Sequence, residues 1–143
     1  MVKLKETLED PGFEVARVLL ADDDPASRLT LQTVLRAGGY RVDSAASAAE
    51  ALGKLDEQEY ELVLADLHME SPESGLKVLA RARMMDYKPA TALLATYNPR
   101  QSSEPNPPTL VEPENLPELM DYVAGLISQR ASRRLRRAMR QAS

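Results

Sequence analysis

Short apolar runs alternate with longer amphipathic segments along most of this chain, and that alternation limits the possible folds most strongly. Four runs have the length and flanking residues of buried strands: residues 15–21, 40–45, 60–65 and 90–95. Helical patterns lie between them, at residues 25–37, 48–58 and 75–86. Strands that are nearly continuously apolar, joined by helices, predict an α/β domain with a parallel sheet covered on both faces.

The alternation changes after the fourth run. Residues 97–108, YNPRQSSEPNPP, hold four prolines and no apolar periodicity, so a helix cannot run through them. Residues 109–112 have the character of a short fifth strand. The segment from Leu116 to Ile127 then places Leu119, Met120, Val123 and Ile127 on one face of an amphipathic helix.

Size and composition fit a single globular domain. A chain of 143 residues with 43% apolar residues can bury a core without disulfides or a structural metal. There is no cysteine, which excludes a disulfide framework, a thiolate metal site and a cysteine nucleophile. The N-terminus has no apolar signal region and no stretch approaches 18 apolar residues. We therefore expect a cytoplasmic protein without a membrane span.

Charge divides the chain unevenly. Residues 1–129 carry 12 Lys and Arg against 22 Asp and Glu, a net charge of −10, whereas residues 130–143 carry six Arg and no acid. The sequence predicts an N-terminal extension at 1–14, a central domain at 15–128 and an Arg-rich tail at 129–143.

Aspartates follow two of the predicted strands. Asp22, Asp23 and Asp24 come directly after the first run, and Asp66 follows the third. In a parallel sheet, ligands bind beyond the carboxyl ends of the strands. Converging carboxylates repel one another, and Mg²⁺ relieves that repulsion because it prefers oxygen ligands. A solvated loop is the alternative, and Asp24 before Pro25 has the pattern of a helix cap.

The stretches LLADDDPASR, ELVLADLHM and TLVEPENLPEL resemble the three signature regions of the response-regulator receiver domain, the phosphoacceptor module of two-component signalling. The resemblance covers residues 15–128. It implies a flavodoxin-like fold with five parallel strands in the order 2-1-3-4-5. It also implies that Asp66 accepts the phosphoryl group and that Asp22, Asp23, Asp66 and the backbone carbonyl of His68 bind Mg²⁺ or Mn²⁺.

Other positions match the family pattern less well. The resemblance implies a phosphoryl-binding hydroxyl at the end of the fourth strand, where Thr96 is the candidate and a shift of one residue would place Ala95. The family's lysine corresponds to Glu112, which reverses the charge beside the incoming phosphoryl group. Two unit charges about 4 Å apart interact by about 4 kcal/mol at an effective dielectric near 20, so phosphorylation should be weaker.

Three further differences concern the same region. Arg100 is a nearby cation that could contact the phosphoryl group in place of the lysine, or it could be a solvated loop residue. The Pro-rich segment replaces the family's fourth helix. Thr109 occupies the position of the family's switching aromatic residue, so no ring can transmit the signal there.

The Arg-rich tail has several interpretations. Ala131, Leu135, Ala138 and Met139 recur at helical spacing among the arginines, so the tail could continue the last helix or remain disordered. An acidic protein partner, nucleic acid or an anionic membrane surface would suit its charge. The absence of interleaved aromatic residues and of a preceding recognition helix argues against sequence-specific DNA reading.

Together these features predict a stand-alone, atypical bacterial receiver that is not an enzyme in its own right. Asp66 would accept a phosphoryl group from a histidine kinase or a phosphotransfer protein, and the signal would leave by contact with an unknown output protein. Two alternatives stay open. The chain could be a pseudo-receiver that binds partners without phosphorylation, or a metal-dependent phosphohydrolase that uses the three aspartates.

Overall fold

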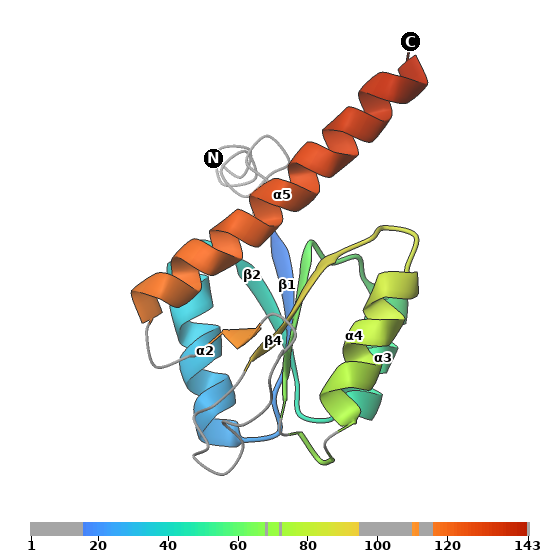
Figure 1. Cartoon of the computed structure of the whole chain (residues 1–143). Helices are drawn as coiled ribbons and strands as arrows, with labels where there is room; N and C mark the ends of the chain where they lie inside the picture. The colour runs from blue at the N-terminus through green and yellow to red at the C-terminus, as the bar shows by residue number, and fades with distance from the viewer. Residues whose placement is uncertain (1–15, 68, 72, 95–109, 112–115, 143) are drawn as a thin grey trace, which may run out of the picture.

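The computed structural model describes residues 16–67, 69–71, 73–94, 110–111 and 116–142. Strands and helices alternate through most of this range (Figure 1). The strands are β1 (Arg17–Ala21), β2 (Arg41–Ala45), β3 (Leu62–Asp66), β4 (Ala90–Leu94) and β5 (Leu110–Val111). The helices are α2 (Pro25–Ala37), α3 (Ala48–Glu57), α4 (Ser74–Met84) and α5 (Leu116–Ala142).

Four of the strands form a parallel sheet in the order β2-β1-β3-β4, as the sequence predicts. The two-residue strand β5 pairs in parallel beside β4. The Pro-rich segment lies outside the described residues, so its replacement of a helix stays a prediction. So does the N-terminal extension at 1–14, which also lies outside them.

Each face of the sheet packs against two helices. On one face, Leu31 and Leu35 of α2 and Leu119 and Val123 of α5 join the buried strand residues in one apolar cluster. The opposite face packs against α3 and α4. Its main helical contributors are Ala51, Leu55, Val78, Leu79 and Ala82. Figure 1 shows the same three layers, which confirm the prediction of helices on both faces.

The helix starts follow local hydrogen bonding that the sequence predicts. The backbone N–H of Ser27 donates to the Asp24 carboxylate (3.0 Å), and Pro25 occupies the first turn of α2. Ser47 caps α3 by accepting from the N–H of Glu50 (3.1 Å). Both caps satisfy backbone donors that have no partner within the helix, so each helix starts directly after its strand.

The last helix is much longer than its apolar pattern predicts. Helix α5 continues without a break from Leu116 to Ala142, past the predicted end at Ile127 and through the Arg-rich tail. Alanine, arginine, leucine, methionine and glutamine are strong helix formers. Because the preceding turns are anchored on the sheet, the extension needs no new nucleation. A disordered tail is therefore the wrong alternative for residues 129–142.

Candidate functional site

The register of the sheet brings two aspartates side by side. Ala21 at the end of β1 is aligned with Ala65 of β3, so Asp22 and Asp66 emerge at the same level on neighbouring strands. The N–H of Asp22 donates to the carbonyl of Ala45 (3.0 Å), which ties this position to β2 as well. The parallel pairing predicted from the apolar runs therefore positions both carboxylates.

Carboxylate oxygens of Asp22, Asp23 and Asp66 all lie within 4.8 Å of one another. The side chains of Asp22 and Asp66 are almost fully buried, at 1% and 4% exposure, whereas Asp23 is exposed. Buried carboxylates are costly unless a cation or hydrogen-bond donors offset their charge. The cluster thus has two buried carboxylates and one at the solvent boundary, an arrangement that could hold a small cation that keeps part of its water shell.

The third aspartate of the DDD stretch does not belong to this cluster. The Asp24 side chain caps α2, and the Asp24 N–H donates to Asp22 Oδ1 (3.0 Å). The turn therefore holds one carboxylate oxygen of Asp22 in place. The helix-cap role of Asp24, predicted from the Asp-Pro pattern, is confirmed by this geometry.

Arg28 is a residue that the sequence reasoning missed. Its guanidinium donates from Nη1 to the backbone carbonyl of Asp22 (2.8 Å). This bond joins the first turn of α2 to the end of β1 and places a positive charge against the acidic loop. The signal in the sequence is weak, because an arginine on the first turn of a helix is common without any role.

Gly75 is a second residue whose role was missed. A Cβ at this position would overlap the backbone carbonyl of Asp66. Helix α4 therefore approaches the end of β3 closely only because residue 75 has no side chain. Beside it, Ser74 is buried and its hydroxyl bonds that of Ser71 (2.8 Å). In the sequence, Gly75 follows SPES like an ordinary glycine. It indicates such a close approach only once the fold is known.

The remaining predicted site residues lie outside the described residues. These are His68, Thr96 with the alternative Ala95, Arg100, Thr109 and Glu112. Their roles stay predictions.

Comparison with known proteins agrees with the fold. The family model of the response regulator receiver domain matches residues 18–103. The chain belongs to this family. Receiver domains of two-component systems are typically signalling phosphoacceptors rather than enzymes, and they pair with histidine kinases or phosphotransfer proteins.

A similar solved structure is the response regulator protein TrrA of Thermotoga maritima, determined in complex with Mg²⁺ and BeF. It is 31% identical, with a TM-score of 0.65, and the alignment covers 78% of this chain and 99% of TrrA. The family assignment therefore rests on fold and sequence together.

Two curated bacterial relatives extend the comparison. The sensory/regulatory protein RpfC of Xanthomonas campestris pv. campestris is 35% identical over 88 residues, which cover 58% of this chain and 12% of RpfC. The transcriptional regulatory protein PrrA of Mycobacterium bovis is 29% identical over 128 residues, which cover 86% of this chain and 54% of PrrA. The receiver thus matches only a fraction of each relative's length. Among the helices that the structure describes, none is both long and apolar enough to cross a bilayer.

Proposed function

We propose that this receiver accepts a phosphoryl group on Asp66 from a phosphohistidine of a partner kinase or phosphotransfer protein. The observation that carries the proposal is the trio of carboxylates within 4.8 Å, with Asp66 almost buried at the end of β3. In this reaction an Asp66 oxygen attacks phosphorus, the O–P bond forms, and the N–P bond to the donor histidine breaks. The leaving imidazole takes up a proton.

Asp22 and Asp23 would hold Mg²⁺ or Mn²⁺ together with Asp66, and the all-oxygen donor set fits such a cation. When bound, the cation neutralises charge on the transferring oxygens. Asp22 orients the site through its bond from the Asp24 N–H, and Gly75 lets the start of α4 lie against the acceptor strand. The backbone carbonyl of His68 completes the ligand set in this proposal.

Several positions at which this chain differs from the family pattern would modify phosphoryl transfer. Glu112 in place of a lysine would make phosphorylation depend more strongly on the metal, with Thr96 and Arg100 as the phosphoryl contacts. Residues 97–108 would form a Pro-rich connection between the fourth and fifth strands, with Thr109 in place of a switching ring. The domain would work in the cytoplasm and pass its signal on by protein contact.

The experiment is phosphorylation with acetyl phosphate and Mg²⁺, followed by mass spectrometry of the intact protein. We expect one added phosphoryl group, absent from Asp66→Asn and strongly reduced in Asp22→Asn. No adduct together with no Mg²⁺ binding at millimolar concentration would contradict the proposal and favour the pseudo-receiver. Steady release of phosphate from p-nitrophenyl phosphate would favour the phosphohydrolase instead.

A further inference from the structure

One face of α5 is apolar in the first turns of the helix and basic in the last turns. Leu119 and Val123 on this face are buried in the core. At the same helical spacing the row continues with Arg130, Arg134 and Arg137. The face that packs on the sheet in the first turns therefore carries guanidinium groups in the last ones.

Arg130 attaches α5 to the turn between α4 and β4. Its side chain is only 6% exposed, and it donates from Nε to the carbonyl of Lys88 (2.9 Å) and from Nη2 to that of Tyr87 (2.7 Å). Lys88 itself has a positive φ of 45°, in the left-handed region that residues other than glycine rarely adopt. The turn between α4 and β4 and the middle of α5 are therefore held against each other.

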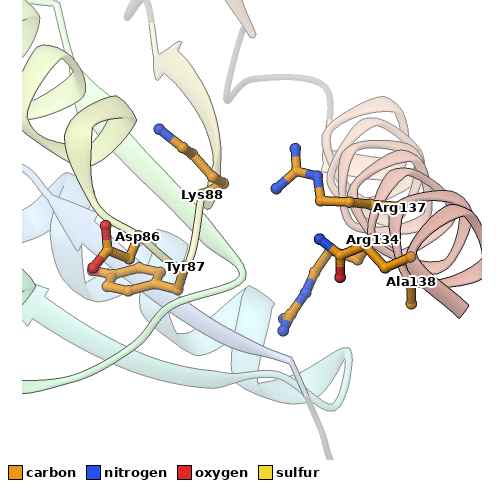
Figure 2. Close-up of a pocket in the computed structure, with 7 residues that line it drawn as sticks. Asp86, Tyr87, Lys88, Arg134, Arg137 and Ala138 are labelled. Atoms are coloured by element: carbon orange, nitrogen blue, oxygen red, sulfur yellow. The ribbon is translucent and has the colours of Figure 1, made fainter.

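Past Arg130, the helix and the turn enclose a cleft of about 230 Å³ (Figure 2). Its lining residues are Asp86, Tyr87, Lys88, Arg134, Arg137 and Ala138, with Gln141. Figure 2 shows Arg134 and Arg137 extending from α5 toward the turn. The Lys88 ammonium points away from them and donates to the carbonyl of Arg83 (3.1 Å).

The two arginines of the cleft have no acidic partner among the residues that the structure describes. No ion pair joins either of them to Asp86, although all three line the same cleft. The whole stretch from Arg130 to Ala142 contains six arginines and no acid. Guanidinium groups held by a helix around a concave surface suit bidentate binding of an anionic group.

Next to the arginines the same helix exposes apolar side chains. Leu135 and Met139 are each 63% exposed and lie one turn apart, about 100° around the helix from the cleft residues Arg134 and Ala138. A nucleic-acid backbone presents mainly charged phosphates and offers little apolar surface to cover them. Two such side chains without an aromatic residue also give little area for insertion into a lipid surface. An acidic protein segment with interspersed apolar residues complements both features.

We infer that the cleft between the α4–β4 turn and residues 130–142 of α5 binds an acidic, amphipathic segment of a partner protein. Carboxylates of the segment pair with Arg134 and Arg137, while its apolar side chains cover Leu135 and Met139. The cleft lies at the edge where the parallel strands begin, opposite the aspartates at their ends. Binding there therefore does not require phosphoryl transfer.

The test measures binding of the full-length protein to a synthetic helical peptide of Glu and Leu, by fluorescence anisotropy of the labelled peptide. Arg134→Gln/Arg137→Gln should weaken binding about tenfold or more, because two charge-assisted pairs are lost. Arg133→Gln/Arg136→Gln removes the same charge outside the cleft and should weaken it by less than about threefold. Leu135→Gln/Met139→Gln should also weaken it. All six side chains are exposed, so folding should be retained, with circular dichroism as the check.

Equal losses in the two arginine pairs would overturn the inference, because general charge attraction would then explain the binding. Tighter binding to a DNA duplex or to phosphatidylglycerol vesicles than to the peptide would assign the surface to nucleic acid or lipid instead. Self-association through residues 130–142, detected by sedimentation and lost in the Leu135→Gln/Met139→Gln variant, would make a second copy the occupant.

Discussion

The backbone of Gly75 at the start of α4 lies directly against the carbonyl of Asp66, with no room for a Cβ between them. The proposed phosphoacceptor strand and the helix that follows it are thus in contact at the site itself. Strain introduced at residue 75 should be felt first at Asp66, since protein interiors are closely packed.

Gly75→Ala tests this contact. We expect a loss of about 1–3 kcal/mol in the free energy of unfolding, because the new methyl group must displace backbone atoms. Gly53→Ala is the matched control: a Cβ there meets nothing within 4 Å in the middle of α3, and alanine should stabilise the helix by about 0.5–1 kcal/mol. Urea unfolding measures both. A similar effect in the two variants would contradict the close approach.

Asp24→Ala separates the helix cap from the metal ligands. Loss of the bond from the Ser27 N–H should lower stability by about 1 kcal/mol. Mg²⁺ affinity, measured by calorimetry, should change much less than in Asp22→Asn or Asp23→Asn, which remove ligand charge. A loss of Mg²⁺ binding in Asp24→Ala as large as in Asp22→Asn would make Asp24 a ligand after all.

Arg130→Gln tests the attachment of α5 to the turn before β4. The carbonyls of Tyr87 and Lys88 would lose a charged donor, so we expect a loss of about 1.5–3 kcal/mol in stability. Hydrogen exchange should also increase in the last turns of α5. Arg133→Gln, an exposed position three residues along, should change stability by less than about 0.5 kcal/mol. Equal stability of the two variants would show that the bonds do not hold the helix.

The free energy of unfolding should fall at alkaline pH because of Tyr60 and Tyr87. Burial raises the pKa of Tyr87 to about 12, and it raises the pKa of Tyr60 further, with a contribution from the hydrogen bond to Asp43. In the unfolded chain a tyrosine ionises near pH 10. Between about pH 10 and 12 the unfolded state therefore releases protons that the folded state retains, so stability falls as pH rises.

Tyr87→Phe should flatten this pH dependence. It should also lower stability by about 1 kcal/mol near neutral pH, since the bond to the Leu55 carbonyl is lost. Urea midpoints measured from about pH 8 to 12 would show both effects, and Tyr60→Phe should flatten the slope as well. An unchanged slope in both variants would refute the assignment to these two tyrosines.

Much of this architecture can be predicted from the sequence. The features that cannot be predicted have physical reasons. Apolar runs such as VLLA and LVLA indicate strands that are buried on both faces. Asp24-Pro25 and Ser47 mark the starts of helices. Strands and helix caps can therefore be predicted from short local patterns. The aspartate cluster follows from them, because parallel strands end at one edge. The length of α5 does not, since apolar periodicity marks only the part of a helix that packs on a core.

Contacts between residues that are far apart in the sequence also could not be predicted. Arg130 looks like the first of six equivalent arginines, yet it is buried because α5 crosses the turn at Tyr87 and Lys88. Gly75 looks like an ordinary glycine at the start of a helix until the end of β3 is placed against it. In both cases the role depends on tertiary packing, which no local pattern encodes.

The most direct measurement is fluorine-19 NMR of the protein with beryllofluoride, with and without Mg²⁺. Beryllofluoride takes the place of a phosphoryl group on a carboxylate, so a bound resonance should appear with Mg²⁺ present. It should be absent without the metal and absent in Asp66→Asn. A bound resonance that persists in Asp66→Asn, or none at saturating Mg²⁺ in the parental protein, would contradict phosphoryl acceptance at Asp66.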